Sequence, residues 1–226
     1  SGLRHGMIFS SGIIRSYEGT KFRSHIRFQS YFYTFAGQGF PMIKADILAF
    51  AAHPDDVELT CSGTLIKEAR LGRKVVVVDL TAGEYGTRGS KEQRLKEAEA
   101  ASPILGLNAR ENLGFRDCFF TNDEAHKLEI VRMIRKYRPE VVLCNAPSDR
   151  HPDHGRAATL VLDSVFLSRL PKIETMQEGV AQQPWHPRTV YHYIQDRYHH
   201  PDFVVDITEV WEERMGAIRA YASQFY

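Results

Sequence analysis

Cysteine is scarce in this sequence, and its scarcity narrows the class of protein. Only Cys61, Cys118 and Cys144 occur among the 226 residues, and none of them has a CxxC partner. Three irregularly spaced cysteines do not form the disulfide framework that stabilises small secreted domains. We therefore expect reduced thiols and a cytoplasmic protein.

Long apolar runs and an excess of positive charge are also missing. No stretch approaches the roughly 20 apolar residues needed to cross a bilayer. The net charge is +1, and the five bases and single acid of residues 1–41 leave 24 bases and 27 acids in residues 42–226. A mildly acidic domain does not favour nucleic-acid binding. We therefore expect a small molecule as the ligand, with no nucleic-acid or membrane partner.

No Gly-, Ser- or Pro-rich linker divides the chain, which is 43% hydrophobic and long enough for one sizeable core. Residues 1–41 are rich in Arg, Ser, Phe and Tyr but lack the apolar stretch of a secretory signal. We interpret them as an N-terminal extension and assign them no chemistry. Regular patterning begins after Met42, so residues 42–226 are predicted to form a single domain.

From Met42 onward, apolar runs typical of buried parallel strands alternate with segments of helical period. This alternation predicts an α/β fold with a doubly wound, mostly parallel sheet and Rossmann-like topology. The predicted strands are 43–52, 74–81, 111–115, 140–146, 188–194 and 202–208, and the predicted helices are 56–71, 90–102, 123–137, 155–169 and 209–224.

Three polar loops follow predicted strands: HPDD after the first, TAGEYGTRGS after the second and APSDRHPDH after the fourth. In open α/β sheets, ligand sites gather at the carboxyl ends of the strands. We therefore expect these three loops to converge on one pocket.

The HPDD loop offers a metal ligand pair. His53 ends its strand, Pro54 suits the first turn of a helix, and Asp56 is three residues beyond His53. The imidazole and this carboxylate can point at one centre, while Asp55 is aimed elsewhere. Taken alone, two aspartates at a helix start are more often capping or dipole-complementing charges.

The HPDH loop repeats the pattern with His151, Asp153 and His154. A lone HxxH is usually a pair of surface histidines, but two His-Pro-Asp tripeptides at one predicted sheet edge favour a shared metal site. Two histidines and one carboxylate are typical of a catalytic zinc site. We predict His53, Asp56 and His154 as ligands of Zn²⁺, with another divalent metal such as Fe²⁺ as the alternative.

The remaining polar residues of these loops suit amide hydrolysis. Asp55 is the candidate general base for a water molecule, against the simpler interpretation as a helix cap. His151 could stabilise the tetrahedral oxyanion as an imidazolium and then protonate the leaving amine.

Five stretches of the sequence resemble the motifs of a known enzyme family. They are AHPDDVE, DLTAGEYGTRGS, ENLGFRD, YRPEVVL and DRHPDHGRA, which in this order resemble the zinc-dependent N-acetylglucosaminyl deacetylases of the LmbE and PIG-L type. The resemblance covers nearly all of residues 43–226. The pattern RHPDHG, with HPDFVVDIT and RAYASQF, is most similar to the bacillithiol-biosynthesis branch, which deacetylates N-acetylglucosaminyl malate.

The resemblance implies further roles. It gives Asp55 the role of base, implies that Asp153 hydrogen-bonds His151, and places Arg94 and Asp117 at the sugar, although Asp117 could equally be a turn residue. It also implies a homo-oligomer, for which we expect a hexamer, and a tail beyond Tyr226 that closes over the site.

Two more substrate-binding candidates come from the residues themselves. Arg88 lies between glycines in the second loop and suits a substrate carboxylate, although it could be a solvated charge. Tyr193 lies on a strand whose residues alternate between two faces, one of which could line the pocket.

The leading hypothesis is deacetylation of N-acetylglucosaminyl malate. The alternatives are another N-acetylglucosamine conjugate, such as a chitooligosaccharide or a thiol-sugar, and a non-catalytic nucleotide-binding module. The last requires a Gly-rich turn after the first strand, where this chain has the acidic HPDDVE, which would repel phosphate.

Overall fold

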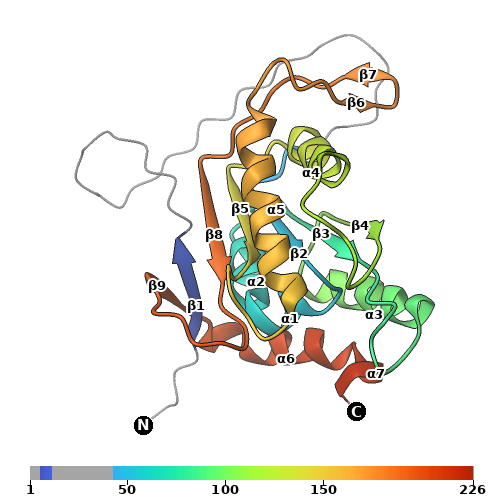
Figure 1. Cartoon of the computed structure of the whole chain (residues 1–226). Helices are drawn as coiled ribbons and strands as arrows, with labels where there is room; N and C mark the ends of the chain where they lie inside the picture. Colours follow the sequence, from blue (N-terminus) through green and yellow to red (C-terminus); the bar gives the residue numbers. More distant parts are fainter. Residues whose placement is uncertain (1–5, 12–42, 226) are drawn as a thin grey trace.

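The computed structural model describes residues 6–11 and 43–225 (Figure 1). Within these residues the strands form a seven-stranded sheet in the order β4-β3-β2-β5-β8-β1-β9 and a separate two-stranded hairpin, β6-β7. The bounds are β1 Gly6–Ser11, β2 Ile47–Ala51, β3 Val75–Thr81, β4 Ala109–Phe115, β5 Val141–Asn145, β6 Met176–Gln177, β7 Val180–Ala181, β8 Thr189–Tyr193 and β9 Phe203–Asp206.

The central part of the sheet is parallel. Strands β4, β3, β2, β5 and β8 are neighbours in that order, and each neighbouring pair is parallel. Numbered along the chain, these five strands have the order 3-2-1-4-5 of a doubly wound fold. The predicted fold class is confirmed. The order reverses between β2 and β5, and a ligand site is expected in the crevice at their carboxyl ends.

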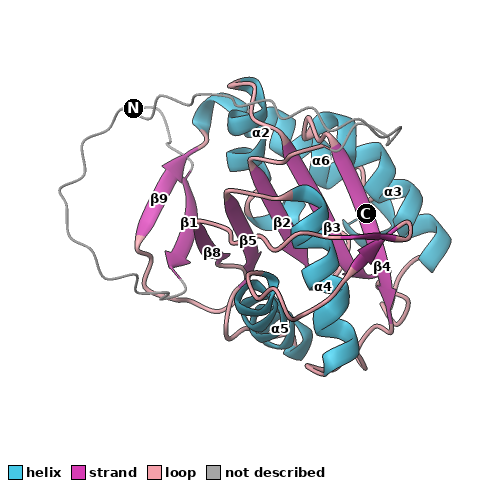
Figure 2. Ribbon diagram, turned by 90° about the horizontal axis from the view of Figure 1, so that it is seen from above, coloured by secondary structure: helices cyan, strands magenta, loops and turns pink. Residues whose placement is uncertain are grey.

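Helices cover both faces of the sheet (Figure 2). Helices α4 (Glu124–Tyr137) and α5 (Pro152–Ser168) cover one face, and α2 (Ser62–Arg70), α3 (Lys91–Ile104) and α6 (Trp211–Arg219) lie on the other side. Helix α1 (Asp56–Thr60) packs in the same buried cluster as α2 and α6. Two short helices, η1 (Thr208–Val210) and α7 (Ala222–Phe225), flank α6. No helix among the described residues combines the length and apolarity needed to cross a membrane.

Strand β2 shows how the two cores form. Leu48 and Phe50 belong to the buried cluster with α4 and α5, whereas Ala49 and Ala51 belong to the cluster with α1 and α2. Successive side chains of a strand point to opposite faces, so an apolar run without alternation is buried on both sides.

Several element bounds differ from those predicted. Helix α5 begins at Pro152, not at residue 155, so Asp153 and His154 lie in its first turn. Helix α3 continues through Pro103, where an end is predicted, and the first predicted helix divides into α1 and α2 at Cys61.

The interpretation of residues 1–41 as an extension needs correction for one stretch. Residues 6–11 form β1, which pairs antiparallel with β8 and β9 and so belongs to the main sheet. Residues 1–5 and 12–42, with the predicted domain start at Met42, lie outside the described residues. A pairing between residues so far apart in sequence leaves no local pattern from which it could be predicted.

Candidate metal centre

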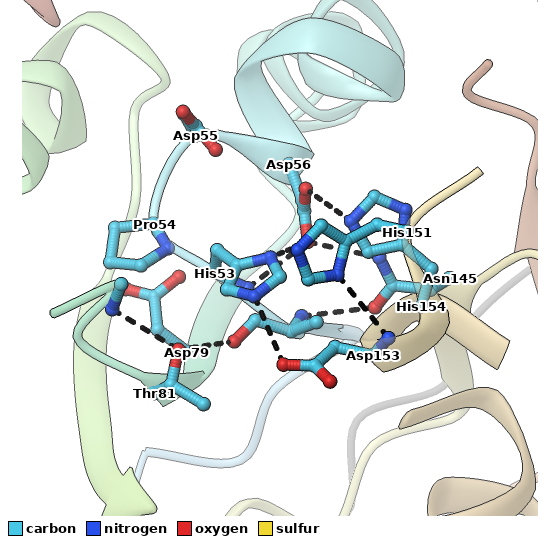
Figure 3. A network of polar contacts seen from close by, with 12 residues as sticks. His53, Pro54, Asp55, Asp56, Asp79, Thr81, Asn145, His151, Asp153 and His154 are labelled. Atoms are coloured by element: carbon cyan, nitrogen blue, oxygen red, sulfur yellow. Dashed lines mark hydrogen bonds and ion pairs between the residues drawn. The ribbon is translucent and has the colours of Figure 1, made fainter. Parts of the chain in front are cut away.

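The HPDD and HPDH loops meet where the strand order reverses. His53 follows β2, and α5 begins shortly after β5, so both loops leave the carboxyl ends of neighbouring parallel strands. Figure 3 shows the imidazoles of His53, His151 and His154 gathered beside Asp56. The predicted convergence of these loops is therefore present in the structure.

Asp56 faces two of the three imidazoles. Its Oδ1 lies 3.2 Å from His154 Nε2, and its Oδ2 lies 3.7 Å from His53 Nδ1. The three residues are only 2% (Asp56), 5% (His154) and 7% (His53) exposed. Although burial favours the neutral acid, the two histidines hold the pKa of Asp56 well below its ordinary value, so the carboxylate is charged.

Three donors fix the Asp56 carboxylate. Its Oδ2 accepts from the backbone N–H of His53 and from Asn145 Nδ2, each at 3.0 Å, and its Oδ1 accepts from Gln195 Nε2 at 3.0 Å. Asn145 is itself held because its Oδ1 accepts from the backbone N–H of Ala52 at 3.0 Å. The carboxylate is therefore rigid before any ligand binds.

The outer nitrogens of both histidines contact other carboxylates. His53 Nε2 lies 3.1 Å from Asp117 Oδ1 and 3.3 Å from Asp153 Oδ2, and His154 Nδ1 lies 2.5 Å from Asp149 Oδ2. Burial opposes a charge on His53, but the carboxylates outweigh it and hold the pKa of His53 well above its ordinary value.

His151 lies at the edge of this cluster. Its ring centroid is 4.6 Å from that of His53 and 5.2 Å from that of His154. It is the N-cap residue of α5, and its Nδ1 accepts from the backbone N–H of Asp153 at 3.3 Å. Burial and the two neighbouring histidines lower the pKa of His151, which favours the neutral imidazole.

The expected contact between the Asp153 carboxylate and His151 needs correction. The Asp153 carboxylate is bound instead by His53, by Arg156 and by the backbone N–H of Cys118 at 2.9 Å. The first turn of α5 points Asp153 toward β4 and its following loop, because His151 takes the capping position.

Asp55 points away from the imidazoles (Figure 3). It precedes α1 with φ 110°, a left-handed conformation unfavourable for a residue with a side chain, and its carboxylate makes no capping hydrogen bond. Burial raises the pKa of Asp55 to about 7, although Arg94 pulls it the other way. Asp55 therefore does not act as a helix cap, and its strained position marks it as a functional candidate.

Arg94 from α3 is the partner of Asp55. Its Nη2 donates to Asp55 Oδ2 at 2.6 Å and to the Pro54 carbonyl at 2.8 Å. The loop after β3 lies directly against it: a side chain at Gly83, which has φ +64°, would place Cβ 2.9 Å from Arg94 Cζ. The structure thus brings Arg94 to the site and directs it at Asp55.

The other predicted substrate-binding residues lie in different surroundings. Arg88 is exposed and donates from Nη1 to the Gln224 carbonyl at 3.3 Å, which ties its loop to α7. Asp117 is buried, and its Oδ2 accepts from the backbone N–H of Tyr85 at 3.0 Å. Tyr193 is 0% exposed and donates its hydroxyl to the Phe50 carbonyl at 2.8 Å, so its prediction as a substrate contact needs correction.

Sequence reasoning missed three residues that surround the cluster. Asn145 and Gln195 bind Asp56, and Asp149 binds His154. Asn145 has a detectable signal, because it is the polar end of an otherwise apolar strand, and Asp149 lies in the loop already singled out for HPDH. Gln195 has no such signal in its surrounding sequence.

A second missed group is a buried ion network beside the site. Arg110 of β4 donates two hydrogen bonds to Asp79, at 2.8 and 2.9 Å, and one to Glu58 Oε1 at 2.6 Å. The hydroxyl of Tyr221 also donates to Glu58 Oε1, at 3.2 Å. The network fixes α1, which carries Asp56, against β3, β4 and the residue before α7.

The donor set fits a divalent metal. Among the described residues, the donor atoms of His53, His151 and His154 lie within 4.8 Å of one another, as do those of His53, Asp117 and Asp153. The Asp56 carboxylate faces His53 and His154 from the centre of the cluster. Imidazole nitrogens with one carboxylate are typical ligands of zinc and of other borderline divalent ions.

The comparisons with known proteins agree with this site. The profile of the PIG-L family, described as GlcNAc-PI de-N-acetylase, matches residues 48–165, which include all of the cluster named above. The diacetylchitobiose deacetylase of Thermococcus kodakarensis is 32% identical over 79% of this chain and 70% of its own length.

More distant relatives differ in their reactions. A probable N-acetyl-α-D-glucosaminyl L-malate deacetylase 2 of Bacillus anthracis is 26% identical over 79% of this chain and 81% of that protein. The 4-oxalmesaconate hydratase of Pseudomonas putida is also 26% identical, over 78% of this chain and 73% of that protein.

Two solved structures have similar folds. The conserved protein TT1542 of Thermus thermophilus superposes with a TM-score of 0.75 at 38% identity, covering 80% of each chain. The N,N'-diacetylchitobiose deacetylase of Pyrococcus horikoshii superposes with a TM-score of 0.71 at 29% identity, covering 80% of this chain and 72% of that chain.

Proposed function

Since this chain belongs to the PIG-L family of deacetylases, we propose that its metal centre hydrolyses the acetamide of an N-acetylglucosamine conjugate. One observation carries the proposal: the Asp56 carboxylate faces both His53 and His154 at the carboxyl ends of the paired strands β2 and β5, with Asp55 adjacent. We propose His53, Asp56 and His154 as the ligands and Zn²⁺ as the metal, which fits two imidazoles and a carboxylate.

When bound by these residues, Zn²⁺ would supply Lewis acidity, which would polarise the amide carbonyl and lower the pKa of a water molecule toward about 7. Asp55 Oδ1 accepts the proton of the attacking water, because Oδ2 is occupied by Arg94. Water oxygen bonds to the acetyl carbon, the carbon–nitrogen bond breaks, and the products are acetate and the amine.

His151 is the proposed second catalytic group. It lies at the edge of the cluster and is only half-buried, so a substrate amide can reach it. The lowered pKa leaves His151 neutral at rest and makes it a ready proton donor once it is protonated; that proton stabilises the tetrahedral oxyanion and then passes to the leaving nitrogen. Asp153 supports this step indirectly, because it binds His53 and Arg156 while its backbone N–H donates to His151.

N-acetylglucosaminyl malate is the first candidate substrate. The stretches RHPDHG, HPDFVVDIT and RAYASQF support it, as does the Bacillus anthracis relative. The malate carboxylates need a cationic partner. Arg88 and Arg116 are exposed in the loops that border the cluster and bind only neutral oxygens, those of the Gln224 carbonyl and the Tyr85 hydroxyl, in the hydrogen bonds of the described residues, whereas Arg94 is ion-paired with Asp55.

Diacetylchitobiose is the second candidate, and exposed aromatic rings favour it. Tyr85 is 52% exposed and Phe119 is 59% exposed, and their centroids are 5.7 Å apart. Hydrogen bonds hold the backbone of both residues near the cluster. The N–H of Tyr85 donates to Asp117, and the N–H of Cys118, the residue before Phe119, donates to Asp153. Aromatic faces offer a large apolar surface on which a second sugar ring can lie.

The test is acetate release from protein of measured metal content. The substrates are N-acetylglucosaminyl malate, diacetylchitobiose and N-acetylglucosamine, each with and without a chelator. We expect chelation to abolish release and added Zn²⁺ to restore it. Metal-loaded protein that releases acetate from none of them, but hydrates 4-oxalmesaconate, would overturn the proposal.

We further propose a closed homo-oligomer, with a hexamer as the expected state. Light scattering on the eluting protein measures its mass directly. A monomeric mass of 25.8 kDa would contradict this expectation.

A further inference from the structure

We infer that Asp149 is a positioning residue that turns the His154 ring, so that the metal is bound through Nε2 of His154. By the same geometry, Asp117 and Asp153 turn His53, so that the metal is bound through its Nδ1. The inference rests on the proposed metal centre but not on the identity of the substrate.

The argument begins with the hydrogen-bonding capacity of each group. A charged carboxylate only accepts hydrogen bonds, and a neutral imidazole carries its proton on one nitrogen and a lone pair on the other. Asp149 Oδ2 lies 2.5 Å from His154 Nδ1, so in the neutral form that a metal requires Nδ1 is the nitrogen that carries the proton. The lone pair is left on Nε2, which is the nitrogen facing Asp56 Oδ1 at 3.2 Å.

His53 has the mirror-image arrangement. Its Nε2 lies within hydrogen-bonding distance of Asp117 and Asp153, so Nε2 carries the proton. Its Nδ1 faces the other oxygen of Asp56, at 3.7 Å. In these neutral tautomers, which are the forms that bind a metal, two lone pairs point at the two oxygens of one carboxylate, and a bound cation would take the place of the inner protons and stabilise the three electron-rich groups.

The group of His53, Asp117 and Asp153 does not form a second metal site by this reasoning. The Asp117 carboxylate already accepts from the N–H of Tyr85, and that of Asp153 accepts from the N–H of Cys118 and from Arg156. A second cation would also have to displace the proton from His53 Nε2. These two carboxylates therefore act on the metal through His53.

Asp149 is held for this role from its other side. Its Oδ1 accepts from the backbone N–H groups of Arg150 at 2.7 Å, Asp196 at 3.2 Å and Arg197 at 3.0 Å. Its Oδ2 is thereby aimed at His154. The two bonds from Asp196 and Arg197 also fix the loop after β8, which supplies Gln195 to Asp56. One carboxylate thus orients a ligand and anchors the loop that holds a second ligand.

The first test is the affinity of Asp149→Asn for Zn²⁺, measured by competition with a chromophoric chelator. Loss of such an outer carboxylate typically weakens metal binding about 10- to 100-fold, and we expect a dissociation constant raised by that factor. Asp196→Asn is the matched control, because Asp196 lies in the same cluster of loops and its side chain is 52% exposed. We expect its affinity for Zn²⁺ to equal that of the wild type.

The second test identifies the binding nitrogens directly. In protein labelled with ¹⁵N-histidine and loaded with ¹¹³Cd²⁺, we expect cadmium–nitrogen coupling to Nε2 of His154 and to Nδ1 of His53. In the wild type, coupling to Nδ1 of His154, or absence of any bound metal, would overturn the inference. Wild-type affinity in folded Asp149→Asn would also overturn it.

These outcomes are separable from those of the proposed function. Wild-type protein that binds zinc through the assigned nitrogens but releases no acetate would contradict the deacetylase proposal alone. Thermal melting of metal-free Asp149→Asn checks that the variant folds. If it does not, the spectrum of the wild type still decides the inference.

Discussion

Arg94 Nη2 donates to Asp55 Oδ2 over 2.6 Å, which joins two residues that are 39 positions apart in the chain. The ion pair holds Asp55 in its unusual backbone conformation, because the same guanidinium nitrogen also binds the Pro54 carbonyl. The proposed base is thus positioned by a neighbouring element, and its own helix makes no contribution through a capping bond.

Replacing Asp55 by Asn should separate metal binding from catalysis. Asn is chosen because it tolerates a positive φ better than most residues. We expect zinc content equal to that of the wild type and a kcat lower by about 10²- to 10⁴-fold, the range for loss of a general base. Acetate release and elemental analysis on one sample measure both. Retention of wild-type kcat would remove Asp55 from the mechanism.

Replacing Arg94 tests whether it serves the base or the sugar. If Arg94 positions Asp55, Arg94→Met should lower kcat by about 10- to 100-fold, as expected for a misplaced catalytic group, and leave KM nearly unchanged. A rise in KM with constant kcat would instead assign Arg94 to the sugar pocket.

Two further variants refine this test. Arg94→Lys should restore part of the lost kcat, because an ammonium group keeps the charge but not the fork of donors. Gly83→Ala should resemble Arg94→Met, because its Cβ would press on the guanidinium and its φ of +64° disfavours a side chain.

The buried network around Arg110 should matter for stability. Arg110→Met leaves the carboxylates of Glu58 and Asp79 without their cation, and breaking such a buried pair typically costs about 3–5 kcal/mol. Urea unfolding should show this loss in the free energy of unfolding. Lys44→Met is the control: its pair with Glu140 is exposed, so its loss should cost less than about 1 kcal/mol. Similar losses in the two variants would contradict the prediction.

The exposed ring of Phe119 should influence substrate choice. If a second sugar lies on it, Phe119→Ala should raise KM for diacetylchitobiose by about 2- to 10-fold, the scale of an aromatic contact. The KM for N-acetylglucosamine should stay near the wild-type value, which serves as the internal control. Equal changes for both substrates would indicate that the ring does not contact the second sugar.

The fold and the convergence of the loops were accessible from the sequence for a simple reason. Parallel strands buried on both faces give unbroken apolar runs, and loops after neighbouring strands share one edge. His53 and Asp56 come together through local spacing, since the backbone N–H of His53 donates to Asp56 Oδ2 within one turn.

The features of the site that could not be predicted from the sequence depend on contacts between residues far apart in the chain. The orientation of Asp153 toward His53 joins residues 100 positions apart, and Gln195 reaches Asp56 from 139 positions away. Alternation along β8 predicts two faces for its residues but not which face is covered, so it does not distinguish Tyr193, which lies in the core, from a residue of the pocket.

Strand β1 has a consequence for the solubility of shortened chains. It pairs through residues 9–11 with Tyr191, His192 and Tyr193 of β8, and through residues 6–9 with β9. A chain beginning at Met42, the boundary predicted from sequence, would leave those backbone groups of β8 without partners. An unpaired strand edge is a template for strands of other molecules. By pairing with β8, residues 6–11 therefore keep this strand from pairing with strands of other molecules, and expression boundaries should include them.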